Sequence, residues 1–129
     1  MKKIISLMML ILSSLLLASC TAPTKPREYR QVTMDEAVKM MRDEKNYIIL
    51  DVRRPDEYAK GHIPGAINVP NETIGTAEIP ELPDKSQLIL VYCRSGKRSK
   101  EASEKLAKLG YTNVVEFGGI LDWKGEIER

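Results

Sequence analysis

The sequence has 129 residues, enough for one domain, and contains 20 Lys and Arg against 18 Asp and Glu. Two of these cations, Lys2 and Lys3, lie in an N-terminal segment that we expect to be removed. The remaining chain then carries 18 cations and 18 acids, so its net charge is near zero. This balance gives no indication of nucleic-acid binding.

Residues 1–19 have the layout of a secretory signal peptide, because two lysines precede an almost wholly apolar run over residues 4–17. The run is shorter than the roughly 20 residues of a membrane-spanning helix. The residues Leu-Ala-Ser-Cys that end at Cys20 are similar to the lipobox of bacterial lipoproteins. That resemblance implies cleavage before Cys20 and lipid on this cysteine. We therefore expect an extracytoplasmic protein anchored through Cys20 to a bacterial membrane, with residues 20–28 as tether; an uncleaved anchor or an ordinary cleavage site are the alternatives.

Residues 29–129 alternate short apolar runs with helical patterns, which predicts an α/β domain with a largely parallel sheet. Thr33 and Glu36 form a capping box at the start of the first helix, and Gly110 is suited to cap the third. Strands are predicted over residues 29–32, 47–50, 66–69, 88–92 and 114–117. Helices are predicted over residues 34–45, 55–60, 99–109 and 120–129, with mostly loop over 71–86.

Asp51 and Cys93 each follow a predicted buried strand. The carboxyl ends of parallel strands meet at one edge of a sheet, and ligands bind beyond that edge. We therefore expect Asp51 and Cys93 to lie on the same edge of the domain.

Cys93 lies where a strand ends and a helix begins, with Arg94, Lys97 and Arg98 within five residues of it. Unpaired N–H groups at the helix start, the helix dipole and these cations all stabilise a thiolate. If Cys20 carries lipid, Cys93 is the one remaining thiol of the chain. These features predict a nucleophile and not a structural cysteine.

Four motifs in order along residues 29–129 resemble those of single-domain rhodaneses. They are Leu50-Asp51-Val52-Arg53, Glu57-Tyr58 with Gly61-His62-Ile63-Pro64-Gly65-Ala66-Ile67-Asn68, Cys93-Arg94-Ser95-Gly96-Lys97-Arg98-Ser99, and Phe117-Gly118-Gly119 with Trp123. The resemblance implies a roughly five-stranded parallel sheet with helices on both faces. It also implies a sulfurtransferase that carries sulfane sulfur as a persulfide of Cys93, without a metal or other cofactor. The donor would be thiosulfate or a similar sulfur-containing anion, and the acceptor cyanide or a thiol.

The predicted persulfide loop comprises Arg94, Ser95, Gly96, Lys97, Arg98 and Ser99. Its backbone N–H groups would surround the outer sulfur, and Gly96 would allow the tight curvature. Its cations would attract an anionic donor and the departing sulfite. The resemblance favours Arg94 and Lys97 over Arg98 as substrate contacts.

Asp51, Arg53 and Glu57 are predicted to support this loop. We expect Arg53 and Glu57 to form a structural ion pair, and Asp51 to hydrogen-bond loop N–H groups or to contact the donor. His62, the sole histidine of the sequence, is expected to stabilise a turn, and Trp123 to contribute packing.

Two alternatives remain open at this stage. A cysteine phosphatase or arsenate reductase on the related fold uses a Cys-x5-Arg loop, whereas Cys93 and Arg98 are separated by four residues. The shorter loop suits a single sulfur atom better than a tetrahedral oxyanion. The second alternative is a membrane-tethered relay or docking module that passes its persulfide to a partner protein thiol.

Overall fold

The structure is a computed structural model that describes residues 28–129. The predicted signal peptide, the predicted lipidation site at Cys20 and nearly all of the predicted tether lie outside the described residues. Within residues 28–129, no helix has the length and apolar character needed to span a bilayer.

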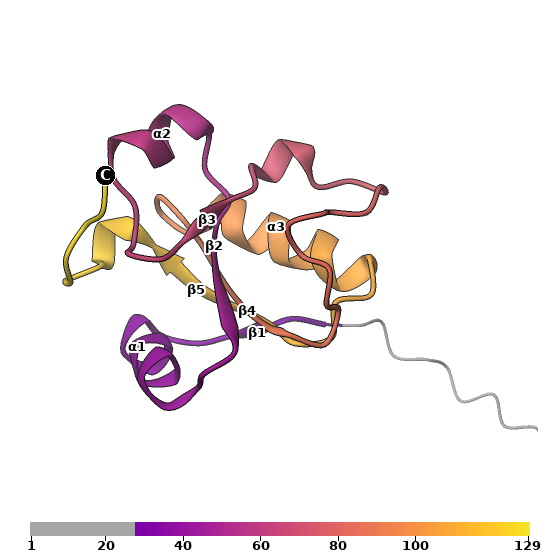
Figure 1. Ribbon diagram of the computed structural model, residues 1–129, viewed down its shortest axis with the longest axis horizontal. Coiled ribbons are helices and arrows are strands. Elements are labelled where there is room, and N and C mark those ends of the chain that lie inside the picture. Colours follow the sequence, from indigo (N-terminus) through magenta and orange to yellow (C-terminus); the bar gives the residue numbers. More distant parts are fainter. Residues whose placement is uncertain (1–27) are drawn as a thin grey trace, which may run out of the picture.

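A five-stranded sheet forms the centre of the domain, and every strand runs parallel to its neighbours (Figure 1). The strands are β1 (Arg30–Gln31), β2 (Tyr47–Asp51), β3 (Ile67–Asn68), β4 (Leu88–Cys93) and β5 (Val114–Gly119), in the spatial order β1-β5-β4-β2-β3. β4 is central and buried along its whole length, as expected for an apolar strand covered on both faces. The predicted strands and their parallel arrangement are confirmed.

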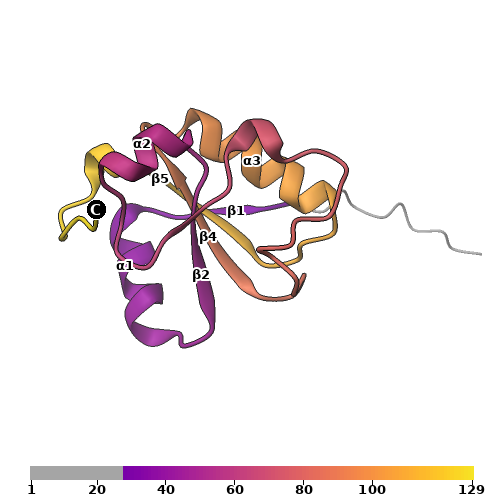
Figure 2. The same cartoon turned by 45° about the horizontal axis from the view of Figure 1, so that its top comes forward.

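The helices cover both faces of the sheet. They are α1 (Met34–Asp43), α2 (Pro55–Lys60) and α3 (Lys97–Lys108), with short 3-10 helices η1 (Asn71–Thr73) and η2 (Ile120–Asp122). Figure 2 separates α1, on one side of the sheet, from α3 on the other. The predicted capping box begins α1, with Glu36 N–H 3.1 Å from Thr33 Oγ1 and Thr33 N–H 2.8 Å from Glu36 Oε1.

Both ends of α3 are set by glycines. Gly96, with φ at 110°, is the N-cap, so the helix begins two residues earlier than predicted. Gly110 has φ at 101°, a left-handed conformation that glycine adopts readily. Its N–H donates to Ala107 O, and the N–H of Tyr111 donates to Leu106 O, which together make a Schellman motif.

The predicted C-terminal helix over residues 120–129 is wrong. The 3-10 helix η2 ends at Asp122, and Trp123 is extended with ψ at 129°. Beyond it, Gly125 packs against the indole ring of Trp123, and Glu128 exchanges backbone hydrogen bonds of 2.8 and 2.9 Å with His62. Pairing with this distant segment keeps the C-terminal residues extended.

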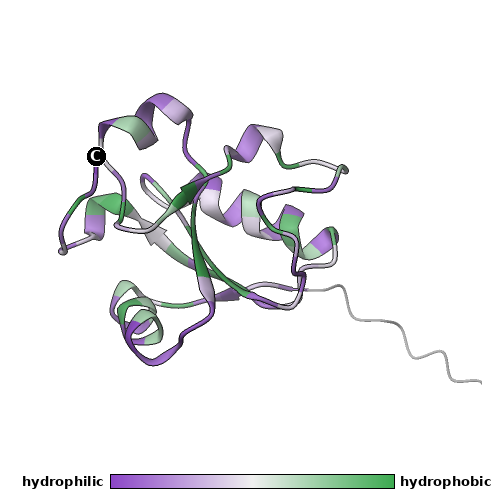
Figure 3. Cartoon of the chain, viewed as in Figure 1, coloured by the Kyte–Doolittle hydropathy of each residue, from purple (hydrophilic) through white to green (hydrophobic). Residues whose placement is uncertain are grey.

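Side chains of β4 alternate between two apolar layers. Figure 3 shows that the central strands of the sheet are largely hydrophobic. Leu88, Leu90 and Tyr92 pack in the layer under α1. Ile89, Val91 and Cys93 pack in the layer under α3. The alternation of a strand therefore places the Cys93 thiol on the α3 face, at the carboxyl end of the sheet.

Candidate active site at the carboxyl end of β4

Cys93 is the last residue of β4 and lies in front of the first turn of α3. Its Sγ accepts a 3.0 Å hydrogen bond from the N–H of Gly96 and lies 3.5 Å from Ser99 Oγ. The left-handed conformation of Gly96 turns the chain so sharply that its N–H points back at the sulfur. The predicted position of Cys93 at a strand–helix junction is confirmed.

The first turn of α3 adds further donors. Within residues 28–129, the N–H groups of residues 97–99 have no protein acceptor, as is usual at a helix start. These groups and the positive end of the helix dipole favour negative charge in front of α3. The site therefore suits a thiolate or a bound anion.

The three loop cations have different surroundings. Arg94 and Lys97 are exposed, and neither forms an ion pair with any residue between 28 and 129. Arg98 is half-buried, and both of its terminal nitrogens donate hydrogen bonds to the Glu57 carboxylate of α2, at 2.7 and 3.1 Å. The hydrogen bonds from Arg98 lower the pKa of Glu57 to about 2. Arg98 thus joins α2 to α3, and the role of Arg94 and Lys97 as substrate contacts stays a prediction.

The glycine pair at the end of β5 holds the loop from the other side. β5 pairs with β4 in register as far as Glu116 and then contains one extra residue, so that Cys93 lies opposite Gly119. Gly118 has φ at 99° in this bulge. A Cβ on Gly119 would lie 2.0 Å from Arg94 O, so only glycine fits there. The N–H of Leu121 donates to the same carbonyl at 3.2 Å.

The predicted ion pair between Arg53 and Glu57 is wrong. Arg53 binds Asp51 instead, with Nε 2.9 Å from Oδ1 and Nη2 2.6 Å from Oδ2, and Nη2 also donates to Gly61 O. The backbone N–H of Arg53 bonds the same carboxylate at 2.9 Å, so the tight turn after β2 folds the guanidinium back onto Asp51. Glu57, in the first turn of α2, faces Arg98.

The expectation for Asp51 is also wrong. Its carboxylate is fully buried and bonds Arg53 and the hydroxyl of Tyr92, and it contacts neither the loop N–H groups nor solvent. Burial and the hydrogen bond to Asp51 raise the pKa of Tyr92. This buried cluster fixes the chain between β2 and α2, which carries Glu57 toward Arg98.

Trp123 packs as expected, and His62, expected to stabilise a turn, contacts the preceding helix α2. The imidazole of His62 stacks on Tyr58 at 3.7 Å between ring centroids, and its Nδ1 lies 2.9 Å from Tyr58 O. Trp123 packs against the apolar layer under α1, and its Nε1–H donates to Glu126 O at 2.9 Å.

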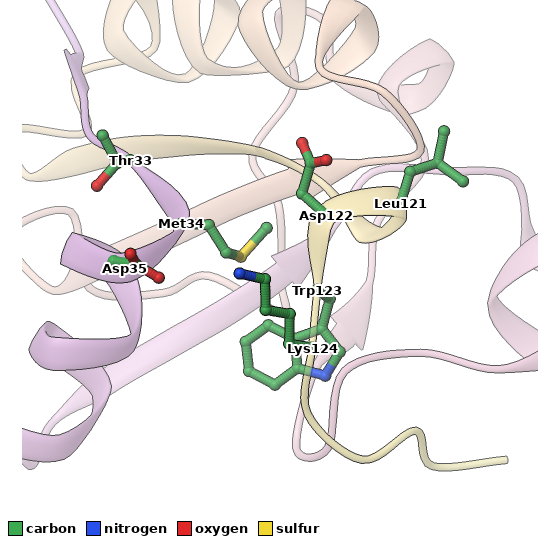
Figure 4. Close-up of a pocket in the computed structure, with 7 residues that line it drawn as sticks. All are labelled: Thr33, Met34, Asp35, Leu121, Asp122, Trp123 and Lys124. Atoms are coloured by element: carbon green, nitrogen blue, oxygen red, sulfur yellow. The ribbon is translucent and has the colours of Figure 1, made fainter.

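A hollow of about 450 Å³ lies between the start of α1 and the segment around η2 (Figure 4). Met34, Trp123 and Lys124 point toward one another there. It is lined by Thr33, Met34, Asp35, Leu121, Asp122, Trp123 and Lys124. Neither Cys93 nor any residue of the predicted persulfide loop lines this hollow.

Glu116 was missed by reasoning from the sequence. Its carboxylate is buried, accepts a 2.5 Å hydrogen bond from Ser99 Oγ and accepts another of 2.9 Å from the N–H of Gly118. The available signal was an acid within the otherwise apolar strand Val114-Val115-Glu116-Phe117. An acid at a strand position that faces the core is unusual and indicates a specific contact.

Comparison with known proteins gives a consistent result. Residues 33–126 match the family model described as "Rhodanese-like domain". The chain is 40% identical over 73 residues to the thiosulfate sulfurtransferase PspE of Escherichia coli, covering 57% of this chain and 70% of that protein. It is 36% identical over 91 residues to the thiosulfate:glutathione sulfurtransferase of Saccharomyces cerevisiae, covering 60% and 65%. A solved structure titled "rhodanese with anions from E. coli" superposes with a TM-score of 0.59 at 35% identity, covering 64% of this chain and 98% of that one.

Proposed function

Because the chain belongs to the rhodanese family and is a rhodanese-type sulfurtransferase, we propose that Cys93 carries sulfane sulfur as a persulfide. The proposed donor is thiosulfate or a similar anion, and the proposed acceptor is cyanide or a thiol. The observation that carries the proposal is the placement of Cys93 Sγ at the carboxyl end of β4, 3.0 Å from the N–H of Gly96 and in front of α3.

The proposed reaction is a double displacement through a covalent enzyme. The Cys93 thiolate attacks the outer sulfur of thiosulfate, the bond between the two sulfur atoms breaks, and sulfite leaves with the electron pair. The acceptor nucleophile then attacks the outer sulfur of the persulfide, and Cys93 departs as a thiolate. Cyanide is thereby converted to thiocyanate, or an acceptor thiolate to its persulfide.

The charges of the loop suit both steps. Thiosulfate and sulfite are anions, and the exposed side chains of Arg94 and Lys97 provide a positive electrostatic field next to Cys93. The free N–H groups of residues 97–99 are donors for a bound oxyanion or for the persulfide. The names of the relatives, thiosulfate sulfurtransferase and thiosulfate:glutathione sulfurtransferase, support this donor and a thiol acceptor.

The phosphatase alternative is disfavoured by Arg98. Both terminal nitrogens of this guanidinium donate to Glu57, so they are not available as a pair of donors for a phosphate. Turnover of p-nitrophenyl phosphate beside thiosulfate–cyanide transfer separates the two activities. We expect sulfur transfer and negligible phosphate hydrolysis, and efficient phosphate turnover without a persulfide would contradict the proposal.

Intact-mass measurement tests the persulfide directly. Incubation with thiosulfate is expected to add the mass of one sulfur atom to the wild type and to the control Glu104→Gln, an exposed substitution on α3 outside the loop. Cys93→Ser is expected to show no gain. A gain that persists in Cys93→Ser would place the sulfur elsewhere. Fast transfer from the loaded enzyme to a protein thiol, with slow transfer to cyanide, would favour the relay function.

Lipid anchoring is the second part of the proposal. We propose that lipid on Cys20 holds the protein on the extracytoplasmic side of a bacterial membrane. The basic start, the apolar run and the lipobox-like residues before Cys20 support this. Labelled palmitate is expected in the membrane fraction for the wild type and to be lost in Cys20→Ser. Label retained by Cys20→Ser would contradict the anchor.

A further inference from the structure

Glu116 is a buried carboxylate that the proposed reaction does not use. It is 3% exposed and lies on the α3 face of β5, opposite Val91 of β4. Within residues 28–129, no Lys, Arg or His lies within ion-pair distance of it. An ionised carboxylate buried without a cation is costly, whereas an apolar side chain would suit the same position.

Hydrogen bonds connect Glu116 to the reactive sulfur through one hydroxyl. Cys93 Sγ lies 3.5 Å from Ser99 Oγ, and Ser99 Oγ lies 2.5 Å from Glu116 Oε2. Ser99 is fully buried in the first turn of α3. Its oxygen also lies 3.0 Å from Gly96 O and 3.3 Å from Gly118 O, but carbonyl groups accept hydrogen bonds and do not take up the proton.

We propose that Glu116 is a positioning residue that exchanges a proton with Cys93 through the hydroxyl of Ser99. The inference rests on the proposed function, in which Cys93 must change between thiol, thiolate and persulfide.

The count of hydrogens leads to this conclusion. Ser99 has one hydroxyl hydrogen. If Glu116 is ionised, that hydrogen points to the carboxylate, and the Ser99 oxygen can only accept from Cys93 as a thiol. If Cys93 is a thiolate and the hydrogen points to the sulfur, the contact between Ser99 Oγ and Glu116 Oε2 is a hydrogen bond only when Glu116 is protonated and donates to Ser99. The hydrogen-bonded path from Cys93 through Ser99 to Glu116 therefore shares one ionisable proton, which is held either by the thiol or by the carboxyl group.

Transfer between the arrangements balances without another reactant. The thiol proton passes to Ser99 Oγ, while the hydroxyl proton of Ser99 passes to Glu116 Oε2. Cys93 becomes a thiolate and Glu116 a neutral acid. The reverse transfer returns the proton when the acceptor has removed the outer sulfur. A buried thiolate beside a buried carboxylate is disfavoured, because two like charges would share one site.

The cationic side chains around Cys93 cannot take the place of Glu116 as the acceptor of its proton. The N–H of Gly118 and the hydroxyl of Ser99 are the groups that face Glu116. The charged groups around Cys93 are Arg94, Lys97 and Arg98 from the loop and α3, with Glu57 of α2 and Glu72 of η1 beyond Arg98. Arginine and lysine remain protonated at neutral pH and cannot accept the proton of Cys93.

The pH dependence of Cys93 alkylation by iodoacetamide tests the proposal. A pair that shares a proton titrates in two macroscopic steps. In the wild type, the alkylation rate is expected to rise, to change by less than about threefold over a plateau of at least one pH unit, and to rise again. In Glu116→Gln the plateau is expected to vanish, and the rate should rise about tenfold per pH unit in one step.

Glu116→Gln is suited to this test because it preserves the local structure. Oε2 alone accepts both hydrogen bonds of Glu116, and the amide oxygen of glutamine can accept the same two. Ser99→Ala interrupts the chain and should also show one step. Glu104→Gln, an exposed substitution on α3, is the control and should keep two steps. A purely structural role of Glu116 would leave the shape of the profile unchanged in Glu116→Gln.

The outcomes are distinct from those of the persulfide experiment, because alkylation needs no sulfur donor. A single-step profile in the wild type overturns the proposal even where a variant fails to fold. Two steps that persist in Glu116→Gln overturn it as well. Two steps that are lost in Glu116→Gln support the proton route, and a missing mass gain with thiosulfate in the same protein would then refute the persulfide function alone.

Discussion

Gly119→Ala should disable the site without adding or removing a polar group. A Cβ at this position would lie 2.0 Å from Arg94 O, 2.4 Å from Arg94 C and 2.6 Å from Ser95 N. These are backbone atoms, so no side-chain rotation relieves the overlap. Reaching an ordinary contact of about 3.5 Å requires the loop or β5 to move by about 1.5 Å.

Such a movement acts on the sulfur of Cys93, because Arg94 directly follows this residue. It changes the 3.0 Å contact between Cys93 Sγ and the N–H of Gly96. A misplacement of about 1 Å costs about 100-fold in rate, so persulfide formation should slow about 100-fold. The overpacking should also lower the free energy of unfolding by about 1–3 kcal/mol.

Quenched-flow mass measurement of persulfide formation and urea unfolding give the two quantities. Gly75→Ala is the matched control, because a Cβ there has no atom within 4 Å. It should leave both the rate and the stability close to those of the wild type. A Gly119→Ala rate within threefold of the wild type, in a folded protein, would refute the reasoning from the overlap.

Three further predictions concern the charged groups. Arg53→Ala leaves the fully buried Asp51 carboxylate without its cation, so urea unfolding should show a loss of about 3–5 kcal/mol; a loss below 1 kcal/mol would contradict it. The pKa of Glu57, lowered to about 2 from 4.5, means that its pair with Arg98 stabilises the fold above pH 4.5 and loses this effect as the pH falls toward 2. Glu57→Gln should therefore be about 1–2 kcal/mol less stable than the wild type at pH 7, with a smaller difference at pH 3, and an equal difference at both would be inconsistent. Lys97→Gln should raise the KM for thiosulfate about threefold at low salt with kcat unchanged, and the effect should shrink as salt is added.

The sequence was sufficient for features that depend on local pattern. The apolar run over residues 88–92 predicted a buried strand, and the charged segment after it predicted that Cys93 ends this strand. The alternation of strands and helices then predicted a parallel sheet, which brings Asp51 and Cys93 to the same edge. Each of these steps uses neighbours in sequence or a rule of topology.

The ion-pair partners of Arg53 and Glu57 became clear only from the folded structure. Arg53 has three carboxylates close to it in sequence, Asp51, Asp56 and Glu57, and sequence spacing alone does not select among them. The selection is made by the turn after β2, which bonds the N–H of Arg53 to Asp51, and by α2, which directs Glu57 to Arg98 of a distant helix. The helix predicted over residues 120–129 was wrong for the same reason, because the pairing of the C-terminal residues with His62 joins segments far apart in the chain.

One irregularity of the sheet accounts for both the shape of the loop and the setting of the buried acid. The extra residue in β5 shifts the register after Glu116, so that Gly119 and not Gly118 lies opposite Cys93. The left-handed turn at Gly118 directs its N–H to the Glu116 carboxylate at 2.9 Å. It also allows Gly119 to reach the backbone of Arg94. A regular β5 would lose both contacts together, so the bulge links the position of the thiol to that of the carboxylate with which we propose it exchanges a proton.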